Sequence, residues 1–457
     1  MDKEKFSGGG IPFARPFIGK EEEEACLRVL RSGWLTTGQE TLSFEKEFAE
    51  FLQNPPDGLQ GAAASPHPPH SSGNELRALA VNSATSGLHL ALEACGVGPG
   101  DLVLAPSYTF TSTAEVARYL GAEVVFVDVS PGGFHMDPSA LEETCRRLSM
   151  GLPPYPQGAP KGEAFYGCGS ENEGRGPRGK PKAVIPVHFG GLACGMRALL
   201  ETVRRYKLKV IEDAAHAFPA LLSGGSASES TDGEGGVSYA GMLGDAGVFS
   251  FYATKTITTG EGGMIVCRDK ETAERISIMR SHGIDRTIWN RYSDTRSSWY
   301  YEVVEPGFKY NIPDILSALG RVQLSRAWQL LAMREKIARR YNEAFAGDRH
   351  FTIPPTGPGN TWHLYPLRLN PGALSCTRER FIEKLKEAGI GASVHFIPLH
   401  KMPYYRNRYH LLESDFPNTM ESYAREISLP IWPGMDESMV ERVISVAKSI
   451  ASEYTID

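Results

Sequence analysis

Lys255 follows an apolar run, Val248–Phe251, and precedes a turn with three glycines, the last of them Gly263. A lysine at the mouth of a buried strand loses hydration, which lowers its pKa and frees its amine to attack a carbonyl. Ser250, five residues upstream, can bind a phosphate oxygen. The two residues suggest a Schiff-base lysine that holds pyridoxal phosphate. A lysine after a strand is more often a solvated surface residue, so the assignment depends on other segments.

Asp213 and His216 form the second group of chemically suggestive residues. Val210 and Ile211 are typical of a strand, so Asp213 falls at its carboxyl end, where open α/β sheets bind their ligands. A carboxylate there can pair with a protonated pyridine nitrogen and keep the ring an electron sink. His216, three residues on, can reach the ring hydroxyl or stack near it. The structural alternative is a helix-capping aspartate and a core histidine.

Two further segments offer a phosphate site and an aromatic partner. Asn82–Leu92 opens a helix with small hydroxyl residues, including Thr85, and exposed N–H groups at a helix N-terminus attract anions. Simple capping by serine or threonine is the alternative for this segment. Phe110, in Pro106–Thr113, can lie over a flat heterocycle or pack in the core.

These candidates share one location. Each lies at or just past the end of a predicted parallel strand: Thr85, Phe110, Asp213, Ser250 and Lys255. Pyridoxal phosphate requires a Schiff-base lysine, an acid at the ring nitrogen, a phosphate cup and a stacking partner. The sequence offers a candidate for each of these four roles. The five residues together therefore support a pyridoxal-phosphate site more strongly than any one of them alone.

The elements that position these residues alternate between strands and helices. The expected strands are Leu76–Val81, Leu102–Ala105, Val124–Val127, Ala183–Val187, Val210–Ile211 and Val248–Phe251. The expected helices are Lys20–Leu30, Thr41–Leu52, Thr85–Cys95, Thr111–Leu120, Pro138–Leu148 and Met196–Tyr206. Such alternation predicts an α/β fold with a mostly parallel sheet flanked by helices.

The C-terminal part has a different pattern. One long or broken helix is expected from Pro313 to Ala346. After it we expect strand Trp362–Leu369, helix Arg378–Ala388, strand Ala392–His395 and helix Glu437–Glu453. We therefore predict a large cofactor-binding domain, residues 1–315, and a smaller α+β domain, residues 316–457.

Three polar segments interrupt the pattern and read as flexible surface insertions: Asn54–Asn74, Gly151–Lys182 and Ser223–Gly241. His67 and His70 in the first could suggest a metal site, but no other ligands lie nearby, so a solvated loop is the better interpretation. We predict no metal.

Composition narrows the class of protein. The 457 residues suffice for two or three domains, and a net charge of −6 argues against a general nucleic-acid binder. No apolar run approaches the ~20 residues that span a membrane, and no signal-peptide core is visible. Seven scattered cysteines without a C-x-x-C pair indicate reduced thiols and a cytoplasmic protein.

Taken together, the motifs resemble the sugar aminotransferase family of fold-type I pyridoxal-phosphate enzymes, the DegT/StrS group. The segments that carry the resemblance are Gly33–Gly38, Asn82–Leu92, Pro106–Thr113, Glu212–Ala217, Ser250–Gly263, Gly307–Asp314, Val394–His400 and Ile427–Gly434. The match covers nearly the whole chain apart from the three insertions. Pro306–Asp314 is most similar to the branch that aminates UDP-4-keto-arabinose (ArnB-like).

The resemblance implies a role for each matched residue. Lys255 forms the Schiff base and shuttles protons, Asp213 pairs with the pyridine nitrogen, and His216 lies near the ring hydroxyl. The other implied contacts are Phe110 on the ring, Ala84, Thr85 and Ser250 on the phosphate, and Thr37 and His395 near the sugar. Asn311 or Lys309 reaches the phosphate from the second subunit of a homodimer. Many relatives carry Asn at position 309 and Arg at position 311, so the choice between these two stays open.

The implied reaction is transfer of an amino group from L-glutamate to a nucleotide-linked keto-sugar, in the biosynthesis of amino sugars for surface glycans. A branch of the family with histidine at the position of Lys255 dehydrates sugars, so the lysine favours transamination. One alternative is another fold-type I enzyme, such as a cysteine desulfurase, with Cys376 as its only faint candidate nucleophile. Another is a cofactor-binding regulator, although no helix-turn-helix candidate is visible. The sequence leaves open which sugar and nucleotide are used, and whether C3 or C4 is aminated.

Overall fold

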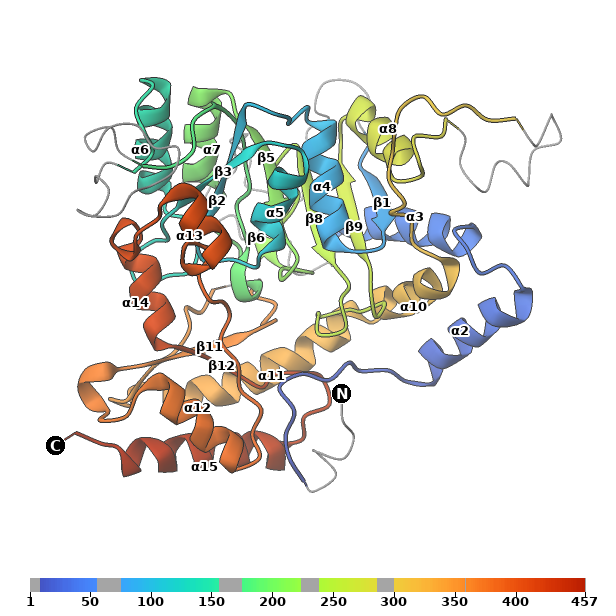
Figure 1. Cartoon of the computed structure of the whole chain (residues 1–457). Coiled ribbons are helices and arrows are strands. Elements are labelled where there is room, and N and C mark those ends of the chain that lie inside the picture. Colours follow the sequence, from blue (N-terminus) through green and yellow to red (C-terminus); the bar gives the residue numbers. More distant parts are fainter. Residues whose placement is uncertain are drawn as a thin grey trace.

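The computed structural model describes residues 9–55, 75–155, 175–222, 238–285, 300–357 and 359–456. Its centre is a seven-stranded sheet in the order β1-β9-β8-β5-β4-β2-β3 (Figure 1). The strands are β1 Arg77–Val81, β2 Asp101–Pro106, β3 Glu123–Val127, β4 Lys180–Val184, β5 Lys209–Asp213, β8 Ala246–Ser250 and β9 Gly263–Cys267. Only β9 runs antiparallel to its neighbours. The predicted α/β fold with a mostly parallel sheet is therefore confirmed, although β9 was not among the expected strands.

Helices cover both faces of the sheet, and in Figure 1 α4 and α5 lie in front of it. The helices of this part are α2 Lys20–Ser32, α3 Gln39–Gln53, α4 Ala84–Ala94, α5 Ser112–Tyr119, α6 Pro138–Ser149, α7 Met196–Tyr206 and α8 Lys270–Met279. Side chains alternate across β8, so Val248 joins the core under α4 and Phe249 joins the core under α3. There the rings of Phe48 and Phe249 lie 5.2 Å apart. A strand with two apolar faces is typical of the buried centre of a parallel sheet.

The C-terminal part has a sheet and a core of its own. The expected long helix is broken at Arg326 into α10 Asp314–Ser325 and α11 Ala327–Phe345. Three antiparallel strands follow, β10 Phe351–Thr352, β11 Tyr365–Leu369 and β12 Glu426–Leu429. Helices α12 Arg378–Glu387 and α15 Glu437–Glu453 pack with them around a second core (Figure 1). The short strands β6 Leu221–Leu222 and β7 Ser238–Tyr239 form a separate pair.

The expected strand Ala392–His395 is wrong. Only Ser393 pairs, in an isolated bridge with Ser428. The N–H of His395 donates instead to the side chain of Glu426, at 3.0 Å, so the segment leaves the strand ladder. The strand beside β11 is β12, which the sequence pattern did not reveal.

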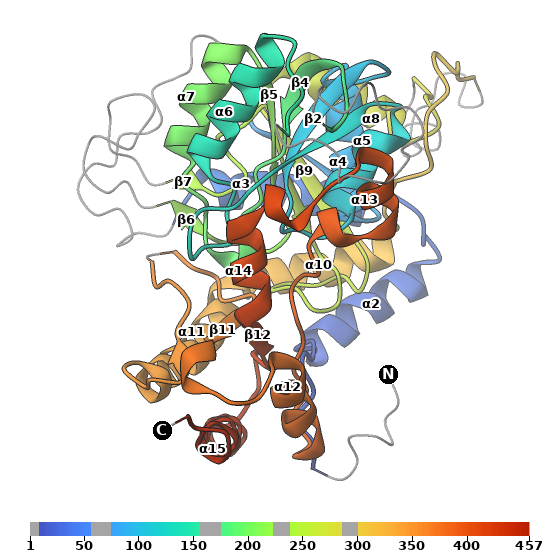
Figure 2. The ribbon, with the colours of Figure 1, turned by 60° about the vertical axis from the view of Figure 1, so that its left-hand side comes forward.

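The division into two domains at residue 315 stays a prediction. We propose it with one change: each part contributes a segment to the core of the other. Ile11, near the N-terminus, belongs to the C-terminal core and bridges to Ile390. Conversely, Tyr405 and Tyr409 of α13 (Pro403–Tyr409) join the core of the large sheet. Figure 2 shows α13, in red, beside α5, and α14 (Pro417–Arg425) leading from there toward β12.

Most of the three predicted insertions lies outside the described residues, His67 and His70 included. Among the residues that the structure describes, no helix is both long and apolar enough to cross a membrane.

Candidate active site

A cavity of about 440 Å³ opens at the carboxyl edge of the large sheet. Parallel strands end at the same edge, so the residues that follow β1, β2, β5 and β8 converge there. Of the predicted residues, the cavity is lined by Ala84, Thr85, Phe110, Asp213, His216, Ser250, Lys255 and His395. Because β9 runs in the opposite direction, its amino end brings Glu261 and Gly262 to the same cavity.

Lys255 lies in the turn after β8, where its N–H donates to the carbonyl of Tyr252 at 2.9 Å. Burial lowers the pKa of its amine to about 8; the carboxylate of Asp213 opposes this shift and Arg334 adds to it. A larger share of the amine is therefore neutral near pH 8 than for an exposed lysine, and only the neutral amine is a nucleophile.

Asp213 ends β5 and is 5% exposed. Its Oδ2 accepts from the hydroxyl of Thr113 at 2.8 Å, and its Oδ1 accepts from the N–H of Ala215 at 3.1 Å. Burial raises the pKa of Asp213, and these two bonds work against that rise. A cationic ligand atom in the cavity would stabilise this carboxylate further.

His216 lies beside Asp213 with its ring fixed by the backbone. The N–H of Gly190 donates to His216 Nδ1 at 3.3 Å, so the proton of the neutral ring lies on Nε2. Burial holds the pKa of His216 well below its usual value, with the nearby Lys255 adding to the shift. His216 is thus a neutral hydrogen-bond donor at this site.

The N-terminus of α4 forms an anion cradle. Ser83 caps the helix by accepting from the N–H of Ser86 at 3.1 Å. The first N–H groups of an α-helix have no partner within it, so those of Ala84 and Thr85 face the cavity beside the hydroxyl of Ser250. Strand β9 approaches so closely that a Cβ on Gly263 would lie 2.7 Å from the nitrogen of Ala84.

These features together fit pyridoxal phosphate. The cradle suits its phosphate, the buried carboxylate suits its ring nitrogen, and the amine of lowered pKa suits its aldehyde. Phe110 is 52% exposed at the cavity, which rules out the alternative that it packs in the core.

Three predicted residues lie elsewhere. Asn311 donates to the hydroxyl of Thr37 at 2.7 Å, and Lys309 donates to the side-chain oxygen of Asn311 at 2.5 Å. This cluster does not line the cavity, so the roles predicted for Thr37, Lys309 and Asn311 stay predictions.

The sequence interpretation missed the residues that close the cavity from other segments. Phe13, Ser393 and Phe396 line it, as does His363, whose Nδ1 is buried without a hydrogen-bond partner among the described residues. Phe396 lies within the motif Val394–His400 but was given no role there, and Phe13, Ser393 and His363 lie outside every motif because packing of distant segments brings them to the cavity.

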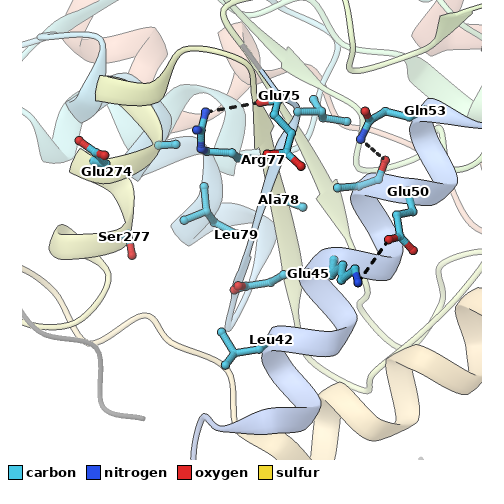
Figure 3. Close-up of a pocket in the computed structure, with 14 residues that line it drawn as sticks. Leu42, Glu45, Glu50, Gln53, Glu75, Arg77, Ala78, Leu79, Glu274 and Ser277 are labelled. Carbon is cyan, nitrogen blue, oxygen red and sulfur yellow. Dashed lines mark hydrogen bonds and ion pairs between the residues drawn. The ribbon is translucent and has the colours of Figure 1, made fainter. Parts of the chain in front are cut away.

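A second hollow, of about 450 Å³, lies at the outer edge of the sheet between β1, α3 and α8 (Figure 3). Glu45 there accepts from the N–H of Ala80 at 2.9 Å, and Lys46 pairs with Glu50 at 3.7 Å on the surface. Its lysine is solvated, so this hollow offers no counterpart to Lys255.

The comparison with protein families settles the class of this site. The model of the DegT/DnrJ/EryC1/StrS aminotransferase family matches residues 16–56 and 72–448. The chain belongs to this family. The gap in the match, residues 57–71, falls within the first predicted insertion.

Similar proteins agree with this membership. SpsC of Bacillus subtilis, a spore coat polysaccharide biosynthesis protein, is 38% identical over 443 residues, which are 96% of this chain and 97% of SpsC. Spr1654 of Streptococcus pneumoniae, a provisionally assigned sugar aminotransferase solved in its PMP form, has a TM-score of 0.77 at 27% identity, over 97% of this chain and 99% of its own. The aminotransferase TlmJ of Streptoalloteichus hindustanus gives 0.74 at 27% identity, over 97% and 99% of the two chains.

The protein is therefore a pyridoxal-phosphate-dependent sugar aminotransferase of fold type I, which confirms the family, fold class and cofactor predicted from the sequence.

Proposed function

We propose that this aminotransferase moves the amino group of L-glutamate to a nucleotide-linked keto-sugar, with a UDP-4-keto sugar as the first acceptor to test. The observation that carries the proposal is the placement of Lys255, of lowered pKa, in one cavity with Asp213 and the α4 cradle. The polysaccharide role in the name of SpsC supports a product used in surface glycans.

The residues of this chain divide the work between binding and proton transfer. Pyridoxal phosphate, when bound, supplies an aldehyde that takes up the amino group and a ring that withdraws electrons. Ala84, Thr85 and Ser250 would hold its phosphate, Asp213 would keep its ring nitrogen protonated, and Phe110 would cover the ring. His216 would donate from Nε2 to the ring hydroxyl.

Lys255 acts as the acid–base group. Its amine takes the proton from Cα of glutamate, and in the second half-reaction the protonated amine gives a proton to the sugar carbon that receives the nitrogen. A pKa of about 8 suits both directions near neutral pH, because both protonation states are well populated.

The cluster of Thr37, Lys309 and Asn311 acts from a second copy of the chain in a homodimer. One hydrogen bond joins Lys309 to Asn311 and the other joins Asn311 to Thr37, so the three side chains would reach the partner's cavity as one unit. In that arrangement Lys309 carries the charge that meets the phosphate, and Thr37 lies toward the sugar.

The alternative functions have less support. Cys376 packs against the C-terminal core and does not line the cavity, and burial raises the pKa of its thiol. A desulfurase needs a reactive thiolate at the cofactor, which Cys376 cannot provide.

The deciding experiment incubates the purified enzyme with glutamate and then with a panel of UDP- and dTDP-keto sugars. Glutamate alone should convert the cofactor spectrum to that of its amine form, and one nucleotide sugar should restore the original spectrum with formation of an amino sugar. No conversion by glutamate would refute the donor assignment. Conversion without any acceptor in the panel would refute the acceptor class tested.

A further inference from the structure

Strand β12 has a buried polar face. Along Glu426–Leu429 the side chains alternate, and Ile427 and Leu429 belong to the C-terminal core. Glu426 and Ser428 point to the opposite face, and both are 0% exposed. A strand that alternates in this way normally turns its polar side to water. Here that side is covered, so its polar groups need partners within the protein.

Their partner is His395, which lines the active-site cavity. The N–H of His395 donates to Glu426 Oε2 at 3.0 Å. The hydroxyl of Ser428 bonds to Glu426 Oε1 and lies 2.9 Å from His395 Nδ1. A continuous chain of hydrogen bonds thus runs from a buried carboxyl to the imidazole, and His395 Nε2 is left without a partner among the described residues.

The single hydroxyl proton of Ser428 allows this chain two arrangements. When Glu426 is ionised, Ser428 donates to it and accepts from His395 Nδ1–H, so Nε2 carries a lone pair. When Glu426 is protonated, its O–H donates to Ser428, the hydroxyl donates to Nδ1, and Nε2 carries the proton. The imidazole is neutral in both arrangements, but its Nε2 changes from acceptor to donor.

We propose that Glu426 and Ser428 are positioning residues that set the tautomer of His395 and couple proton exchange at its Nε2 to protonation of Glu426. When Nε2 accepts a proton from a bound ligand, the Nδ1–H bond breaks as a new Ser428 O–H bond forms, and the old Ser428 O–H bond breaks as a Glu426 O–H bond forms. Reversal of these steps returns the proton from Nε2. The acceptor sugar is the ligand in question, because its carbonyl oxygen leaves as water and needs protons; this part rests on the proposed function.

Burial shifts the pKa values of Glu426 and His395 in the directions that the proposal requires. Burial raises the pKa of Glu426 to about 8, against the opposing effects of Ser428, the His395 N–H and Arg378. Burial lowers the pKa of His395 to about 4, and Lys255 adds to this shift, so the ring stays neutral. The buried Tyr108 is a further titratable group near Glu426, and burial raises its pKa as well. Among Glu426, Ser428 and His395, Glu426 is therefore the group whose charge changes near pH 8.

The first test is spectroscopic and needs no sugar. In the holoenzyme with ¹⁵N-labelled histidine, His395 should change from the Nδ1–H to the Nε2–H tautomer as the pH falls from about 10 to about 6. Infrared difference spectra over the same range should show the carbonyl band of a protonated carboxyl. A single tautomer across this range, or a band that persists in Glu426→Gln, would overturn the proposal.

Variants distinguish proton transfer along Glu426, Ser428 and His395, which we call the relay, from a role of these residues in packing alone. In Glu426→Gln the amide oxygen must accept from the His395 N–H, so the NH₂ group faces Ser428 and fixes His395 as Nε2–H at every pH. Ser428→Ala should uncouple the two groups, and Ser428→Thr should retain the coupling because it keeps the hydroxyl. Ser422→Ala is the matched control, since Ser422 is also buried and its hydroxyl donates to the carbonyl of Gly133 at 2.7 Å, away from His395 and Glu426. An unchanged tautomer transition in folded Ser428→Ala contradicts the relay.

The rate of amino transfer to the sugar gives the second readout. It should fall about 10- to 100-fold in Glu426→Gln and Ser428→Ala, while conversion of the cofactor by glutamate changes less. Equal losses in both half-reactions would instead indicate a merely structural role. The NMR and infrared spectra test proton transfer among Glu426, Ser428 and His395 without any sugar. They can therefore contradict this proposal even if the enzyme accepts none of the keto-sugars tested, and the reverse also holds.

Discussion

Arg334 of α11 donates from Nη2 to the carbonyl of Thr254, the residue before Lys255, at 3.4 Å. Its Nη1 donates to the carbonyls of Trp362 and Ile431, at 3.2 and 2.8 Å. Arg334 is 2% exposed, and all the acceptors described for its guanidinium are carbonyls. One buried cation thus connects the turn that bears Lys255 to the C-terminal core.

Arg334→Met should loosen this connection and alter Lys255. Loss of the donor leaves buried carbonyls unsatisfied, which should lower the free energy of unfolding by about 1–3 kcal/mol in urea titrations. Removal of the positive charge should raise the pKa of Lys255 in the cofactor-free protein, measured from the pH dependence of cofactor uptake. Arg339→Met, an exposed position on the same helix, is the control and should change neither quantity.

Lys255→Ala should abolish the absorbance of covalently bound cofactor and lower turnover by at least about 100-fold, since the main proton-transfer group is gone. The α4 cradle remains, so phosphate-dependent binding of the cofactor should persist in equilibrium dialysis. Lys46→Ala removes an exposed lysine that pairs with Glu50 on the surface, and it serves as the control. Full turnover in Lys255→Ala would exclude its assigned role.

Asp213→Asn should keep the fold but lose about 100-fold in turnover. The amide cannot balance the charge of a protonated ring nitrogen, and electrostatic contributions of this size are usual at active sites. Thr113→Val removes only the hydroxyl that donates to Asp213 and should have a smaller effect. Steady-state kinetics and circular dichroism of both variants check the prediction; wild-type turnover in Asp213→Asn would contradict it.

Stability of the cofactor-free protein should depend on Lys255 at alkaline pH. The folded-state pKa is lowered from 10.5 to about 8, so between these values the unfolded chain binds more protons than the folded one. The free energy of unfolding should therefore gain a rising contribution from about pH 8 to pH 10.5. Denaturation of Lys255→Met across this range should lack that rise; an identical slope in both proteins would show that Lys255 titrates normally.

The large sheet could be predicted, and so could the site residues that it positions, because each of these residues lies at or just after the end of a strand. Asp213 follows Val210 and Ile211, and Lys255 follows β8, so local patterns were sufficient. Strand β9 escaped prediction because Gly263–Cys267 begins within the glycine-rich turn, where its register against β1 and β8 is not visible.

The C-terminal contributions could not be predicted from local pattern. His363 precedes β11, Phe13 comes from the N-terminal segment, and Glu426 reaches the site only through Ser428 and His395. Glu-Ile-Ser-Leu, residues 426–429, has the alternation of a half-exposed strand, and only tertiary packing shows that its polar face is buried. The same packing drew residues 392–395 away from the strand that the sequence indicated.

Glu426 should influence stability in the opposite sense to Lys255. Its folded-state pKa is raised from 4.5 to about 8, so between these values the folded protein holds a proton that the unfolded chain releases. The free energy of unfolding should therefore lose a contribution as the pH rises from 4.5 to about 8. Glu426→Gln cannot titrate, so its stability should fall less over this interval than that of the wild type. Ser422→Ala should follow the wild-type slope with a constant offset. Parallel curves for the wild type and Glu426→Gln would mean that folding does not raise the pKa of Glu426, and the tautomer exchange at His395 would then have no proton source near neutral pH.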